Sequence, residues 1–171
     1  LGKATLIGAN LINCNFFQAR MAKANLSNAQ LNGANLKEAA LSGVDMTAAN
    51  LTGANLNNVM AFNANFTKTK LSGADLRDAN LGAVNFTLAV LAKADLSNSN
   101  LRKAQLVDAN LSKAVLFKSN LRGANLTNAF LLGAVLTSSK LIKSNLSNSN
   151  LIGANLTKAD LSYANLSDGN L

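Results

Sequence analysis

Residues 154–171, ANLTKADLSYANLSDGNL, place a leucine at every fifth position. The spacing runs through the whole chain: of the 35 positions taken five apart from Leu1 to Leu171, 29 hold leucine. The residue two before each of these positions is alanine in 23 of 34 cases and another small residue in the rest. The residue between the pair is Asn or Asp in 22 of 34 cases. One uninterrupted five-residue repeat therefore predicts a single domain over residues 1–171.

A period of five fits neither a continuous helix nor a long strand. A helix turns about 100° per residue, so leucines five apart would scatter around its surface. In a strand, side chains alternate between faces, so leucines an odd number apart would alternate as well. Within one repeat, however, the order apolar, polar, apolar has period two, and the next two positions are rich in turn formers. Each repeat is therefore predicted to be a short extended side followed by a corner, and the repeats to stack as a solenoid.

Glycine at the second corner position indicates how many sides make one coil. Five such glycines fall in one column if a coil has four sides, and they spread over three columns if it has three: Gly33, Gly53, Gly73, Gly133 and Gly153. Ser and Thr at the first corner position also recur at multiples of twenty. Four sides, twenty residues per coil and about 8.5 coils fit the sequence best.

The motif resembles the A-(D/N)-L-x-x unit of the pentapeptide-repeat family, as in GADLRDANLG (73–82) and KADLSYANLSD (158–168). The resemblance covers the whole chain and implies an all-β fold, a right-handed quadrilateral β-helix with leucine or phenylalanine stacked inside. The family is abundant in cyanobacteria and chloroplasts, which implies a photosynthetic source. The compartment stays open between the cytoplasm and a thylakoid lumen or periplasm.

The composition offers little for catalysis. The chain has no His or Trp, and its one cysteine, Cys14, lies in the inward small-residue column, where we expect a core residue. The longest apolar stretch, residues 129–136, has eight residues and is too short to cross a bilayer. No glycine-rich phosphate loop or repeat of calcium-binding type is present. We expect a protein that is not an enzyme and has no cofactor or metal site.

Two local features have competing interpretations. Asp75 and Asp95 stack one coil apart with Asp78 at a nearby corner, which would allow weak cation binding, but a solvated face with Lys37 and Arg77 nearby is favoured.

The second feature is Ala61, which interrupts the leucine column. We expect local repacking with Phe66 filling the space; a bulge that turns Phe62 inward is the alternative.

The net charge of +8 is concentrated on one of the four sides. Taking each column residue with its predecessor and its two followers, the side of Leu1 carries eight basic residues against Asp160 alone, or +7. We call these residues the basic side: Lys3, Arg20, Lys23, Arg102, Lys103, Arg122, Lys140 and Lys143. They form two clusters, with Ala40, Met60, Phe62 and Ala83 between them.

Outward apolar residues gather at another corner, within about three coils. We call them the corner patch: Val90, Val115, Phe117, Phe130, Leu132, Val135 and Ile152. Contiguous exposed apolar groups often mark an interaction site. Packing between neighbouring columns on the sheet surface is the alternative.

These features predict a binding or scaffold protein that presents flat faces to a protein partner of unknown identity. Self-association through the patch or the coil ends stays open. A second hypothesis is that the basic side binds nucleic acid or an anionic membrane, without sequence specificity. The resemblance suggests a third, because some family members mimic DNA and occupy type II topoisomerases. The charge of +8 argues against the third, since mimicry of phosphates requires an acidic rod.

Overall fold

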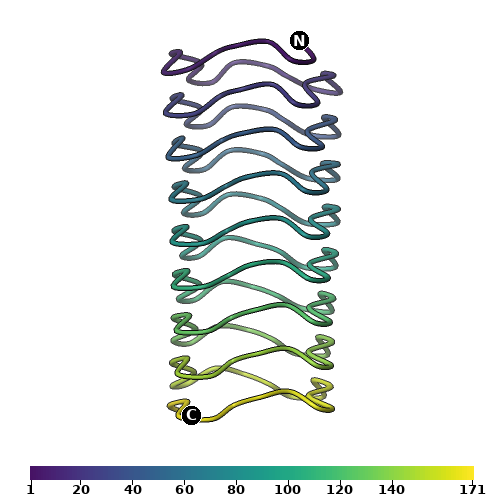
Figure 1. Cartoon of the computed structure of the whole chain (residues 1–171), viewed down its shortest axis with the longest axis vertical. Helices are drawn as coiled ribbons and strands as arrows, with labels where there is room; N and C mark the ends of the chain where they lie inside the picture. Colours follow the sequence, from purple (N-terminus) through teal and green to yellow (C-terminus); the bar gives the residue numbers. More distant parts are fainter.

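The computed structural model describes all 171 residues as a straight stack of four-sided coils, with the two ends of the chain at opposite ends of the rod (Figure 1). It contains no helix, and each strand is reduced to one bridging residue per side. The bridges are all parallel and join residues twenty apart, from Thr5–Asn25 to Asn150–Asn170. The predicted four sides and twenty residues per coil are therefore confirmed.

Backbone hydrogen bonds between successive coils hold the stack together. On one side, the Leu6 N–H donates to the Asn25 carbonyl at 2.7 Å, and the Asn25 N–H donates to the Ala4 carbonyl at 2.9 Å. The same pair of bonds recurs on every side. Because each coil bonds only to the coils before and after it, the rod is stabilised by interactions between neighbouring coils.

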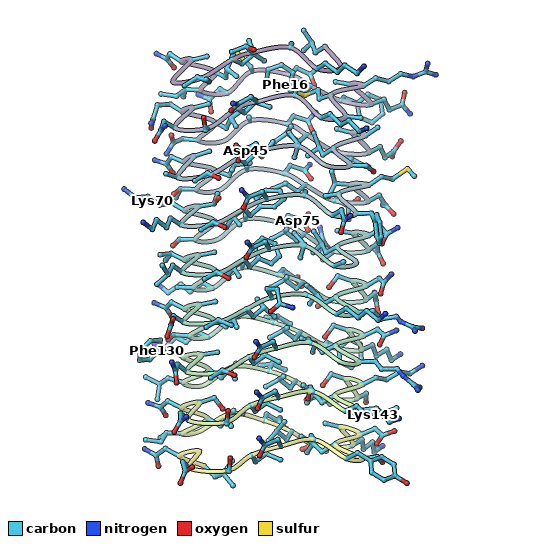
Figure 2. All side chains as sticks on the ribbon, in the orientation of Figure 1. Phe16, Asp45, Lys70, Asp75, Phe130 and Lys143 are labelled. Atoms are coloured by element: carbon cyan, nitrogen blue, oxygen red, sulfur yellow. The ribbon has the colours of Figure 1, made fainter.

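The interior is one continuous column of leucine and small residues. Leucines from Leu26 to Leu151 and nearly all the alanines between them are buried, whereas the corresponding residues of the first and last coils are partly exposed. Cys14 belongs to the first coil and is half-buried. Charged side chains such as Lys70 and Lys143 project from the edges of the rod (Figure 2). The predicted inward position of leucine and alanine is confirmed.

Ala61 sits in this column without disturbing it. Ala61 is fully buried, its N–H donates to the Asn80 carbonyl at 2.9 Å, and the neighbouring Met60–Asn80 bridge is intact. Phe62 is 51% exposed, so a bulge that turns it inward is wrong. Phe66 is fully buried on the next side, with its ring centroid 5.2 Å from that of Phe86.

Every corner has the same backbone conformation. The fourth residue of the turn donates back to the leucine carbonyl, as from Ala4 to Leu1 at 3.0 Å, and the second corner residue has a φ between +53° and +67°. A positive φ there is the requirement of a type II turn and favours glycine. Glycine fills 8 of the corners, including Gly53, and other residues fill the remaining 26. Stacking therefore imposes a left-handed conformation on many residues that rarely adopt it.

The outward Asn or Asp completes each corner. In the inner coils, the first corner residue is the one whose N–H has no backbone acceptor. The side-chain oxygen of an Asn or Asp two residues earlier accepts that N–H, as Asn25 does from Ser27 at 2.9 Å and Asn55 from Asn57 at 3.0 Å. All 21 Asn or Asp residues of this position that precede a corner do so. These residues are therefore turn caps as well as polar surface.

Candidate interaction surfaces

The corner patch has an exposed centre. Phe130, Leu132 and Ile152 are 51%, 44% and 43% exposed, and Leu132 and Ile152 hold the same corner position in consecutive coils. Val135 follows Leu132 around that corner and forms a bridge with Val115 in the preceding coil. These five residues form one apolar surface around a single corner of the rod.

The other two patch residues lie at its margins. Val90 is two coils from Phe130 in the same column, with the polar Asn110 between them. Phe117 is 37% exposed and lies at the following corner, where the Lys118 ammonium sits 5.0 Å from its ring centroid. The structure therefore brings five of the seven predicted residues together and places Val90 and Phe117 at the edge.

Apolar residues replace the capping Asn or Asp at six of these positions, two outside the patch (Ala40 and Met60) and four within it: Val90, Val115, Phe130 and Val135. None of these side chains accepts a hydrogen bond, so the N–H two residues later lacks the partner that Asn or Asp provides. A hydrogen bond of this kind contributes about 0.5–1.5 kcal/mol. For Phe130 the loss is not offset by full burial, because half of its surface stays in water. The patch therefore carries a local cost in stability.

The basic side lies opposite the patch. Figure 2 shows Phe130 and Lys143 at opposite edges of the rod. All eight predicted basic residues are exposed, as the sequence predicts. Between their two clusters, Met60 and Phe62 are 56% and 51% exposed. The basic side is therefore a surface of mixed character with an apolar middle.

A hollow of about 440 Å³ opens where this apolar middle meets the second basic cluster. Its floor is Gly82 and Ala83, with Phe62 on one side and Arg102 and Lys103 on the other. Two outward asparagines, Asn80 and Asn100, complete the lining, with the Asn100 amide donating to Asn80 Oδ1 at 3.1 Å. The five-residue repeat gives no general indication of this hollow. The one feature of the sequence that could have indicated it is Gly82, because glycine holds a first corner position only at Gly2 and Gly82.

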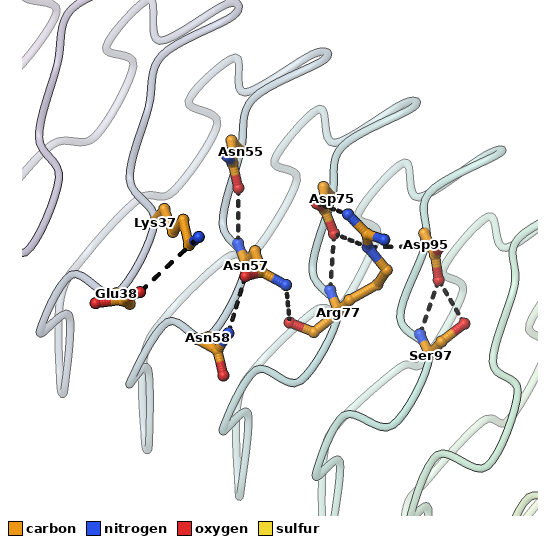
Figure 3. A network of polar contacts seen from close by, with 9 residues as sticks. All are labelled: Lys37, Glu38, Asn55, Asn57, Asn58, Asp75, Arg77, Asp95 and Ser97. Atoms are coloured by element: carbon orange, nitrogen blue, oxygen red, sulfur yellow. Dashed lines mark hydrogen bonds and ion pairs between the residues drawn. The ribbon is translucent and has the colours of Figure 1, made fainter.

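Asp75 and Asp95 both lie close to the guanidinium group of Arg77. Arg77 donates to Asp75 from Nε at 2.9 Å and from Nη2 at 2.7 Å, and its Nε lies 3.9 Å from Asp95 Oδ2 (Figure 3). Asp95 also accepts from the N–H and hydroxyl of Ser97 at 2.9 and 2.6 Å. These contacts agree with a solvated ion-paired face, the interpretation favoured by the sequence.

Arg77 changes the acid–base behaviour of Asp75. Its hydrogen bonds hold the pKa of Asp75 below the ordinary value, although partial burial of Asp75 acts in the opposite direction. The Asp75 carboxylate in turn raises the pKa of Arg77. A carboxyl group with a lowered folded-state pKa stabilises the fold above its unfolded pKa, and this contribution is lost as pH falls through the folded pKa.

We therefore expect Arg77→Met to reduce the loss of stability on acidification. The melting temperature of the wild type should fall slightly more between neutral pH and pH ~3 than that of the variant. The difference should be small, because exposed ion pairs contribute little. Arg122→Met, at the equivalent corner position of another side, should follow the wild-type profile. Parallel profiles for wild type and Arg77→Met would contradict the expectation.

Comparison with known proteins places this fold in context. The pentapeptide-repeat family model matches the chain in 8 copies, over residues 1–37, 39–78, 79–116, 114–151 and 139–171. Among solved structures, HetL, a pentapeptide repeat protein involved in heterocyst differentiation regulation from the cyanobacterium Nostoc sp. strain PCC 7120, is 31% identical. The match covers 96% of this chain and 84% of HetL, with a TM-score of 0.44.

Two further structures are similar over most of the chain. The plasmid-mediated fluoroquinolone resistance protein QnrB1 is 18% identical, with coverage of 98% of this chain and 89% of QnrB1 and a TM-score of 0.45. A pentapeptide repeat protein from the thylakoid lumen of Arabidopsis thaliana is 25% identical, with coverage of 75% and 66% and a TM-score of 0.28. No curated protein sequence gives a match. No helix of the structure is long and apolar enough to span a membrane.

Proposed function

The chain belongs to the pentapeptide-repeat family, whose members form right-handed quadrilateral β-helices, and from this premise we propose that it is a non-enzymatic scaffold that binds a protein partner through the corner patch. The observation that carries the proposal is the replacement of turn-capping residues by apolar ones. At four patch positions a hydrogen-bonding cap is absent, and Phe130 remains half exposed. Burial of Phe130 against a partner would remove its apolar surface from water and so offset the cost of the missing caps, which the isolated rod does not offset.

Several features of the patch suit a protein interface. Aromatic residues dominate the energetics of interfaces, and Phe130 lies beside Leu132 and Ile152 on a rigid corner. A rigid surface limits the conformational entropy lost on binding. HetL, the relative of highest identity described above, is involved in regulation, a role that a non-catalytic binding surface would suit.

Mimicry of DNA is not proposed. The rod carries a formal net charge of +8, and its most charged side is basic. Such a surface repels the groups that bind phosphates rather than attracting them.

Substitution of both patch aromatics tests the proposal. We expect Phe117→Ser with Phe130→Ser to leave the fold intact and to abolish most partner capture or self-association, because both side chains lie outside the core. Sedimentation measures self-association, and photocrosslinking from position 132 in a native extract identifies a partner whose affinity is then measured. Loss of roughly tenfold or more in affinity is expected for removal of interface aromatics.

A single variant separates the structural role of Phe130 from its binding role. Phe130→Asn restores a cap for the Leu132 N–H, so it should maintain or raise the melting temperature while weakening association. Leu88→Ser, which removes an exposed apolar group on another side, is the matched control and should leave association unchanged. A lowered melting temperature with Phe130→Asn would mean that the ring is structural. Unchanged association with an intact fold would refute the patch as a docking site.

A further inference from the structure

We propose that the hollow beside Phe62 binds an acidic peptide segment carrying one apolar side chain. The apolar side chain lies against Phe62 above Gly82, and the carboxylates of the peptide face Arg102 and Lys103. This site is on the basic side, opposite the corner patch, and does not depend on the function proposed for that patch.

One side of the hollow depends on a residue that lacks a side chain. A Cβ added to Gly82 would lie 3.1 Å from Phe62 Cδ2, tighter than most Cβ contacts, so the ring would have to move slightly. Gly82 does not have a positive φ, so the backbone does not require glycine there. Val107 holds the equivalent corner position elsewhere, which shows that the turn accepts a branched side chain. Glycine at this position therefore allows the Phe62 ring to lie close over the backbone at the edge of the hollow.

The volume and lining suit a side chain with adjacent carboxylates. A hollow of about 440 Å³ falls within the usual range for a small-ligand site, about 300–1,000 Å³. Arg102 presents a planar guanidinium that matches a carboxylate in two-point contact. Lys103 lies beside it, and Arg122 follows Arg102 in the next coil, so the positive charge continues beyond the hollow. No acidic residue lines the hollow.

The mixed character of the surface favours a peptide over a nucleic acid. No basic residue occupies this side between Lys23 and Arg102, whereas a phosphate backbone bound along the rod would require charge throughout. The gap is instead occupied by exposed Met60 and Phe62. A duplex would leave these apolar groups uncovered, and one aromatic ring provides a single stacking platform for a single strand. An acidic peptide with an apolar residue complements both parts of the surface.

The test uses the full chain and a labelled nine-residue peptide of Asp and Glu with a central Phe. Binding is measured by fluorescence anisotropy at low salt, and thermal melts check each variant. Phe62→Ser, Arg102→Ser and Gly82→Val should each weaken binding roughly tenfold, because each removes a contact or fills the hollow. Arg20→Ser controls for charge on the same side but away from the hollow, and Phe130→Ser controls for an aromatic on the opposite face. Both should change the affinity less than about threefold.

Two further probes complete the design. Replacing the central Phe of the peptide by Ser should weaken binding roughly tenfold, which shows that the apolar contact matters. Equal losses for Arg102→Ser and Arg20→Ser would overturn the proposal in favour of diffuse attraction. A single-stranded oligonucleotide of equal charge that binds more tightly, with the same dependence on Phe62, would assign the site to nucleic acid. Absence of peptide binding at about 1 mM, equivalent to a very weak site, would also overturn it.

Discussion

Replacing Leu91 by alanine is expected to lower the free energy of unfolding by about 2–5 kcal/mol. Leu91 has no exposed surface and lies in the inward column between Leu71 and Leu111. The backbone of each coil is fixed by hydrogen bonds to the coils on both sides, so the rod has little freedom to collapse around the lost side chain. The cost should therefore include the cavity as well as the lost transfer of apolar surface from water. Urea denaturation measures the change.

Asn100→Ala is the matched control in the same coil. Asn100 is partly exposed, and its side chain accepts from the Arg102 N–H at 3.3 Å and donates to Asn80 Oδ1 at 3.1 Å. Loss of the cap should cost about 0.5–1.5 kcal/mol, clearly less than the leucine cavity. Equal losses at the two sites would contradict the assignment of leucine to the inside and asparagine to the outside.

The architecture could be predicted from the sequence because few backbone geometries are compatible with a strict five-residue period. The five-residue spacing of leucine excludes a helix, and the column of Gly33, Gly53 and Gly73 distinguishes four sides from three. Bridges between residues twenty apart confirm both inferences. The length of the solenoid follows once the coil size is known.

The corner chemistry could not be predicted in the same way. Lysine is a poor indicator of a positive φ, yet Lys93 and Lys113 have φ values of 60° and 59° because the coils above and below impose the turn. The outward Asn and Asp were expected to face water, and their role in capping the next corner appears only when the hydrogen bonds of the backbone are followed. Tertiary context decides both features.

The surfaces were predictable to different degrees. The basic side follows from the column assignment alone, and so does the cluster of Phe130, Leu132 and Ile152. The hollow does not, because it depends on how the Phe62 ring lies relative to Gly82, which is a matter of side-chain conformation. The incorrect alternative of an inward Phe62 arose because the small Ala61 implied a defect that the backbone does not show.

Replacing Phe66 by alanine is expected to lower the free energy of unfolding by about 3–5 kcal/mol, among the largest losses expected for a single substitution in this rod. Phe66 is fully buried and packs against Phe86, with ring centroids 5.2 Å apart. The preceding side of the same coil holds Ala61 in place of a leucine, so the variant would have alanine on two successive sides. The resulting cavity should exceed that left by Leu91→Ala. Calorimetry and urea denaturation measure the loss.

The hypothesis that Phe66 fills the space beside Ala61 predicts that substitutions at these two residues are coupled. If Phe66 fills the space beside Ala61, Ala61→Leu alone should destabilise the rod by about 1–3 kcal/mol through overpacking. In the Phe66→Ala background the same substitution should stabilise it, because leucine then occupies the cavity. The coupling free energy of the double-mutant cycle should be about 1 kcal/mol or more. Phe86→Ala lies one coil further along and is the control, because Ala61→Leu should not rescue it. Additive effects at residues 61 and 66 would show that the two side chains do not share the space, and that the missing leucine is accommodated elsewhere in the coil.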